Sequence, residues 1–139
     1  MGGARVLDLY AGSGALAIEA LSRGASQATL VDSSTAAVAA IRRNLAALEL
    51  DAEVRRQPVQ SFIRGALETG RQYDLVFADP PYRLASSLPG SWLDGLLDSG
   101  ARVVAESDKR APVELATLEL VDERRYGDTL IRIYHAPAR

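Results

Sequence analysis

The chain has 139 residues, of which 47% are hydrophobic and 24% are charged, and it contains no cysteine. This composition indicates one globular domain with a substantial core, and it excludes disulfide bonds and metal sites built from thiolates. The net charge of -2 excludes a protein that grips nucleic acid over its whole surface, so such binding would need a local patch, a partner or a further segment.

Apolar runs of strand length alternate with segments of helical spacing along the chain. Buried strands are predicted at 5–10, 27–32, 52–57, 73–78, 101–107, 112–120 and 129–135. Helices are predicted at 15–23, from a cap at Ser33 or Ser34 to about 48, at 59–68 and at 89–97. This alternation predicts an α/β fold in which a parallel sheet carries helices on both faces. No run is long enough to span a bilayer and the first residues do not resemble a signal peptide, so we expect a cytoplasmic protein.

Three aspartates fall at or near the carboxyl ends of different predicted strands. Asp8 lies in the first strand, Asp32 ends the second, and Asp79 follows the fourth. Because the carboxyl ends of parallel strands meet at one edge of the sheet, we expect the three side chains to face a common crevice. A ligand site at this edge is therefore predicted.

The turn after the first strand, residues 12–17, matches the loose dinucleotide pattern G-x-G-x-x-A. Asp32 follows at the distance of an acid that binds ribose hydroxyls, so a nicotinamide enzyme is one interpretation. Asp8, four residues before Gly12, would repel a pyrophosphate and favour a cationic ligand. S-adenosylmethionine carries an ammonium and a sulfonium, and its carboxylate could meet the backbone N–H groups at the start of the next helix. We therefore prefer S-adenosylmethionine as the cofactor.

The fourth predicted strand ends in Asp79-Pro80-Pro81-Tyr82. Neither proline can donate a hydrogen bond to a sheet, so the chain must leave the strand in a stiff loop. The Asp79 carboxylate and the Pro80 carbonyl could accept the two hydrogens of an exocyclic amine, and Tyr82 could stack on the base that carries it. The sulfonium supplies its own leaving group, so no metal is required.

The segments 8–16 and 79–82 resemble motif I and the catalytic loop of class I methyltransferases. Together with 19–25 and 124–129 they resemble the RsmD family over nearly the whole chain. The resemblance implies a Rossmann-like class I methyltransferase fold with a mainly parallel seven-stranded sheet and an antiparallel last strand. It also implies methylation of the N2 amine of a guanine in 16S rRNA, with the rRNA or the assembled small ribosomal subunit as the partner.

Two departures from the family pattern stand out. We expect residues 1–139 to form a single methyltransferase domain that lacks a further amino-terminal segment which helps the family engage RNA. An Asp or Asn that often contacts the adenine amine after the third strand is replaced by Gln57-Pro58-Val59. Adenine recognition would then fall to backbone groups near Val59, with weaker cofactor binding as a consequence.

Candidate site residues fall into three groups by their expected role. The catalytic residues are Asp79, Pro80 and Tyr82. The cofactor-binding residues are Asp8, Tyr10, Gly12, Ser13, Gly14, Asp32, Ser33 and Val59. The substrate-binding residues are Pro81, Arg83, Lys109, Arg110, Arg124 and Arg125, whose basic members form a phosphate-facing rim if the sixth strand runs parallel to its neighbours. Glu106 ends the fifth strand on the same edge, and His135 is expected to be structural.

Other functions remain open from the residues alone. The same loop chemistry serves methylation of adenine N6 in DNA or of a glutamine amide in a protein. A non-catalytic module that binds S-adenosylmethionine or RNA is a further alternative for this shortened chain. A nicotinamide oxidoreductase would leave Asp79 to Tyr82 unexplained. We expect a monomer that binds no membrane and no metal.

Overall fold

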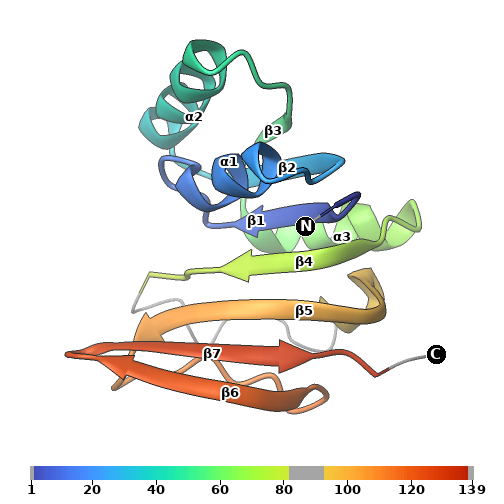
Figure 1. Ribbon diagram of the computed structural model, residues 1–139, viewed down its shortest axis with the longest axis vertical. Coiled ribbons are helices and arrows are strands. Elements are labelled where there is room, and N and C mark those ends of the chain that lie inside the picture. Colours follow the sequence, from blue (N-terminus) through green and yellow to red (C-terminus); the bar gives the residue numbers. More distant parts are fainter. Residues whose placement is uncertain (1, 82–92, 138–139) are drawn as a thin grey trace.

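The computed structural model describes residues 2–81 and 93–137, which form a seven-stranded sheet with helices on both sides (Figure 1). The strands are β1 (Arg5–Leu9), β2 (Gln27–Asp32), β3 (Glu53–Arg56), β4 (Tyr73–Ala78), β5 (Leu97–Asp108), β6 (Glu119–Tyr126) and β7 (Thr129–His135). The helices are α1 (Ala15–Ser22), α2 (Thr35–Ala47) and α3 (Val59–Glu68), with a 3-10 turn, η2 (Asp94–Leu96), before β5.

The strand order is β3-β2-β1-β4-β5-β7-β6. The first five strands pair in parallel, and β7 runs antiparallel to both β5 and β6. Because both neighbours of β7 oppose it, β6 points in the same direction as β1 to β5. The carboxyl ends of six strands therefore lie at one edge of the sheet, which confirms the predicted fold class and its antiparallel last strand.

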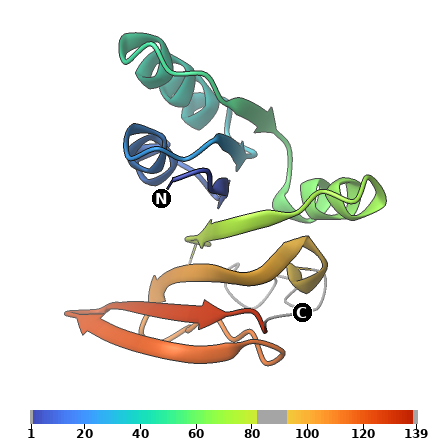
Figure 2. The same cartoon turned by 45° about the vertical axis from the view of Figure 1, so that its right-hand side comes forward.

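Alternate residues of the central strands pack into two separate hydrophobic cores, one on each face of the sheet. Leu7 and Leu9 of β1 pack on the face covered by α3, whereas Val6 packs on the face covered by α1 and α2. Figure 2 shows α1 and α2 on one side of the sheet and α3 on the other. Burial on both faces explains why β1, β2 and β4 read as continuous apolar runs.

The prediction of a sixth strand at 112–120 was wrong. Val113 and Leu115 are 1% and 2% exposed, but they enter the core from a loop that precedes β6. The hydroxyl of Tyr134 donates to the carbonyl of Val113 at 2.6 Å and holds this loop against β7. β6 instead occupies residues 119–126, most of which lie between the strands predicted at 112–120 and 129–135. An edge strand exposed to solvent can carry the charges of this segment.

Two boundaries near β5 also differ from the prediction. β5 begins at Leu97 rather than at 101, with a register irregularity opposite Tyr73 and Leu75. Residues 94–96 form the 3-10 turn η2, so the end of the helix predicted at 89–97 was wrong. The first part of that helix, through Trp92, lies outside the described residues.

Gly14 is expected to be intolerant of a side chain. It caps α1 with a φ of +81°, and an added Cβ would lie 2.9 Å from Cδ2 of Leu30 and 3.3 Å from Cγ1 of Ile41. Left-handed strain together with core crowding should lower the free energy of unfolding of Gly14→Ala by about 2–4 kcal/mol. Gly12→Ala is the matched control, because Gly12 has a φ of +61° but open space around its Cβ position. Urea denaturation measures both variants, and equal losses would show that the crowding contributes nothing.

Candidate active site

A cavity of about 350 Å³ opens at the carboxyl edge of the sheet, where β1, β2 and β4 end and α2 and α3 begin. We call it the central cavity. It is lined by Tyr10, Asp32, Ser33, Ser34, Pro58, Val59, Gln60, Asp79 and Pro81. A cavity of this size, at the end of parallel strands and between helices, has the position and the volume of a small-molecule site.

Asp32 is held in place by the backbone on either side of the cavity. Its Oδ2 accepts the N–H of Gly12 at 2.9 Å, and its Oδ1 accepts the N–H of Ser34 at 2.9 Å. A carboxylate has about four acceptor positions, so each oxygen can still accept from a ligand hydroxyl. The fixed orientation suits recognition of a pair of neighbouring hydroxyls.

Tyr10 sits at the point where β1 turns into the loop, with an unusual φ of 61°. A non-glycine residue in this region costs on the order of 1–3 kcal/mol and often marks a functional site. Its side chain is half-buried, packs against the core beside α3 and lines the central cavity.

Asp8 lies beneath this edge of the sheet with only 3% of its surface exposed. Burial raises the pKa of Asp8 to about 7, and the nearby charges of Asp79 and Asp32 add to the rise. The N–H of Ala17, at 3.3 Å from Oδ2, stabilises the carboxylate and opposes the effect. A buried acid that ionises near neutral pH favours a cationic ligand close by.

Asp79 leaves the end of β4 and lies exposed at the mouth of the cavity. Desolvation, followed by the negative charge of Glu106, raises the pKa of Asp79 to about 6. Such a carboxyl group is a base poised near neutral pH, and perturbed acids of this kind cluster at active sites. The structure therefore brings Asp8, Asp32 and Asp79 together at one edge, as the strand pattern indicated.

The glycine turn contributes less to the cavity than its motif suggested. Gly12, Ser13 and Gly14 are absent from its lining. The N–H of Gly12 binds Asp32 and the N–H of Ala17 binds Asp8, so these two backbone donors are used within the protein. The turn fixes the two acids, and contact of a ligand carboxylate with the backbone N–H groups at the start of α1 stays a prediction.

Lining residues that the sequence did not single out for the site are Ser34, Pro58 and Gln60. Ser34 and Pro58 follow predicted strands, and Gln60 lies in the first turn of the helix after the third strand. Their place in the alternating pattern was the signal that could have found them, because any residue directly after a parallel strand reaches this edge.

The predicted basic rim lies near the same edge, but most of its charges are paired. Lys109 contacts Asp128 at 3.1 Å, Arg110 contacts Asp108 at 2.8 Å and Arg124 contacts Asp122 at 3.0 Å. Arg125 is exposed near the end of β6. Tyr82 and Arg83 lie outside the described residues.

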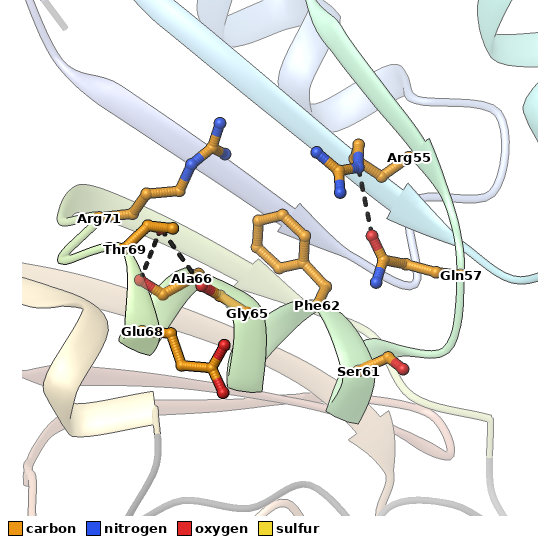
Figure 3. Close-up of a pocket in the computed structure, with 9 residues that line it drawn as sticks. All are labelled: Arg55, Gln57, Ser61, Phe62, Gly65, Ala66, Glu68, Thr69 and Arg71. Carbon is orange, nitrogen blue, oxygen red and sulfur yellow. Dashed lines mark hydrogen bonds between the residues drawn. The ribbon is translucent and has the colours of Figure 1, made fainter.

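A separate cavity of about 320 Å³ lies between α3 and β3 (Figure 3). Arg71 makes two hydrogen bonds to Glu53, at 2.6 and 3.0 Å, and its guanidinium lies 5.9 Å from the ring centre of Phe62. Arg55 contacts both Glu53 and Gln57, at 3.1 and 3.2 Å. The two arginines are engaged by groups of the protein, so this cavity is explained by the docking of the edge strand and carries no reaction chemistry.

Among residues 2–81 and 93–137, no helix combines the length and apolar character needed to cross a membrane. In the same part of the chain, no group of three or more His, Cys, Asp or Glu side chains is arranged to hold a metal ion.

Comparison with known proteins gives matches over nearly the whole chain. The family model described as Conserved hypothetical protein 95 matches residues 1–135. The chain is 34% identical to the putative rRNA methyltransferase YlbH of Bacillus subtilis, over 95% of this chain and 76% of that protein. It is 34% identical to the ribosomal RNA small subunit methyltransferase D of Escherichia coli, over 98% of this chain and 70% of that protein. The solved structure of the putative methyltransferase yhhF from Escherichia coli superposes with a TM-score of 0.85 at 34% identity, covering 99% of this chain and 78% of that one.

Proposed function

The chain belongs to the RsmD family. We propose that it methylates the N2 amine of a guanine in 16S rRNA, with S-adenosylmethionine as the methyl donor. The observation that carries the proposal is the convergence of Asp8, Asp32 and Asp79 around the central cavity. The rRNA, or the small ribosomal subunit assembled around it, is the proposed partner.

The residues around the central cavity fit S-adenosylmethionine. Asp32 has lone pairs left for the two ribose hydroxyls, and each charge-assisted bond contributes roughly 1.5–3 kcal/mol. Asp8 supplies buried negative charge for the cationic end of the molecule. Val59 and Pro58, at the start of α3, offer an apolar wall for the adenine. Tyr10 and Ser33 complete the proposed cofactor contacts.

When bound, S-adenosylmethionine supplies a methyl group on a positively charged sulfur, and transfer to an amine breaks one S–C bond, forms one N–C bond and releases one proton. The amine of guanine is a poor nucleophile because its lone pair is delocalised into the ring. Asp79 and the carbonyl of Pro80 accept the two amine hydrogens, which favours a more pyramidal nitrogen with a freer lone pair.

Asp79 then takes the released proton, for which a pKa of about 6 is well matched. Orientation of the amine by two fixed acceptors supplies much of the rate gain, since well-placed reactants can gain roughly 7–11 kcal/mol. A guanine within a helix must leave its stack to reach the cavity, at a cost of a few kcal/mol.

Transfer of labelled methyl groups tests the proposal. Small ribosomal subunits, naked rRNA, duplex DNA and total protein from cells lacking the enzyme would be incubated with it and methyl-labelled S-adenosylmethionine. Label recovered as N2-methylguanosine from the rRNA is the expected result. Label in N6-methyladenine or in a glutamine amide would replace this proposal with one of the other amine substrates, and failure to bind the cofactor would reject the enzyme altogether.

A further inference from the structure

A second cavity, of about 270 Å³, lies on the other side of the Asp79–Pro81 loop, against the ends of β5 and β7. We call it the β5–β7 cavity. It is lined by Asp79, Pro80, Pro81, Glu106, Ser107, Asp108, Asp128 and Thr129. Asp79 and Pro81 also line the central cavity, so the two cavities meet at the loop proposed to hold the acceptor amine.

The acids of the β5–β7 cavity are not equivalent. Asp108 is paired with Arg110 and Asp128 with Lys109. The side chain of Glu106 forms no ion pair or hydrogen bond within the described residues. Glu106 directly follows Ala105, which pairs with Ala78 of β4, and Asp79 directly follows Ala78. Both acids line this cavity, and the negative charge of Glu106 acts on Asp79. Glu106 is therefore the acceptor left available next to Asp79.

A second, independent feature of this cavity is Ser107. Ser107 is 7% exposed, lines the cavity, and forms no side-chain hydrogen bond in the part of the chain that the structure describes. A hydroxyl at the wall of a cavity can donate to a polar ligand or accept from it. The cavity thus presents Asp79, Glu106 and Ser107 to a polar ligand.

The edges of the nucleobases differ in what they present beside the exocyclic amine. In guanine the N2 amine is followed by N1–H, so the edge presents two neighbouring donors, with the acceptor O6 beyond them. In adenine and cytosine the neighbour of the amine is a bare ring nitrogen, which accepts hydrogen bonds. An ionised carboxylate can only accept, so two adjacent carboxylates complement guanine and repel the ring nitrogen of the other two bases.

Resting on the proposed function, we infer that the β5–β7 cavity receives the target guanine and that Glu106 selects it by accepting its N1–H while Asp79 accepts its N2 amine. Glu106 is then a specificity-determining residue, and Ser107 provides a further polar contact to the base. Glu106 would therefore disfavour adenine as the methylated base, because the lone pair on adenine N1 would face the Glu106 carboxylate and be repelled by it. Sites built to bind a polar donor discriminate strongly against analogues that lack it.

Base analogues test this assignment directly. Short uridine-rich RNA strands would carry guanine, inosine or 2-aminopurine at one central position. Inosine keeps N1–H but lacks the amine, whereas 2-aminopurine keeps the amine and has a bare N1. Fluorescence anisotropy measures the Kd of each strand, and labelled cofactor measures transfer to the guanine and 2-aminopurine strands. The wild-type protein should bind the guanine strand most tightly, because inosine lacks the amine from which Asp79 accepts, and it should bind the 2-aminopurine strand about tenfold or more weakly than the guanine strand.

Glu106→Gln should remove this preference, because a glutamine amide can either accept from N1–H or donate to a bare N1. Transfer to guanine should fall about 10- to 100-fold, and Glu106→Asp should recover part of it. Glu119→Gln is the matched control, since Glu119 is an exposed acid at the far end of β6. Its base preference should equal that of the wild type, and thermal melting would show that each variant is folded.

Three results would overturn the assignment: equal binding of all three strands by the wild type, binding of none, or an unchanged preference in Glu106→Gln. Labelling of rRNA guanine without any base preference would reject the role of Glu106 and leave the proposed function standing. Base preference without label transfer to any substrate would reject the proposed function and leave the recognition of guanine standing.

Discussion

Asp79→Ala is expected to lower the rate of methyl transfer by about 100- to 10,000-fold while leaving cofactor binding nearly intact. The variant loses both the acceptor that orients the amine and the base that takes its proton. The ribose-binding side of the central cavity should be unaffected, because Asp32 is held by hydrogen bonds from the backbone N–H groups of Gly12 and Ser34. Calorimetry would measure cofactor affinity, and a tritiated-methyl assay would measure transfer.

Asp32→Ala is the reciprocal control. It should weaken cofactor binding by about 10-fold or more, since each charge-assisted bond to a ribose hydroxyl contributes roughly 1.5–3 kcal/mol. Near-normal transfer by Asp79→Ala would remove Asp79 from the catalytic step. An unchanged dissociation constant in Asp32→Ala would remove Asp32 from the cofactor site.

The pH dependence of transfer separates the two roles of Asp79. Its pKa is raised to about 6, so the ionised base is lost as the pH falls through that value and transfer should fall with it. Asp79→Asn keeps an oxygen that accepts an amine hydrogen but cannot take the proton. Residual transfer by Asp79→Asn should therefore be slow and should no longer rise with pH through about 6.

The parts of the fold that the sequence predicted well are those with strong burial. β4 and α3 have the predicted bounds because β4 is buried in the middle of the sheet and α3 has one clear apolar face. β6 was misplaced because an exposed edge strand has neither a buried position nor an apolar face. Val113 and Leu115 are buried at alternate positions of a loop, and this spacing is the one expected of a strand. A hydrophobic pattern in the sequence indicates which residues are buried. It identifies a strand only where the buried residues belong to that strand.

The candidate site also has features that the sequence predicts and features that it does not. The convergence of Asp8, Asp32 and Asp79 could be predicted, because it depends only on parallel strands sharing an edge. The ion pair of Lys109 with Asp128 could not, because it depends on the register between β5 and β7. The hydrogen bond from the N–H of Gly12 to Asp32 likewise depends on how the turn after β1 folds. The sequence therefore identifies Asp32 as a site residue but does not reveal the hydrogen bonds that orient its carboxylate.

Asp8→Asn is expected to stabilise the ligand-free protein above pH 7 and to weaken cofactor binding at the same time. The pKa of Asp8 is about 7 in the folded chain and about 3.9 in an unfolded one. Between these values the unfolded chain releases its proton first, so the unfolded state binds fewer protons and folding stability falls as the pH rises. A difference of about three pKa units corresponds to a loss of up to about 4 kcal/mol, complete above pH 7.

Asparagine avoids this loss because it is neutral at every pH and keeps an oxygen that accepts the N–H of Ala17. Urea denaturation of both proteins from pH 4 to pH 8 measures the difference in their free energies of unfolding, which removes the contributions of acids common to both. That difference should be near zero at pH 4 and should grow in favour of Asp8→Asn toward pH 8, while Asp51→Asn, at an exposed acid, should follow the wild type. Because the neutral variant also loses its attraction for a cationic ligand, the added stability should be accompanied by a larger dissociation constant for S-adenosylmethionine. A stability difference that does not change with pH would mean that Asp8 is ionised in the folded chain throughout, and its burial would then have to be balanced by a group other than the cofactor.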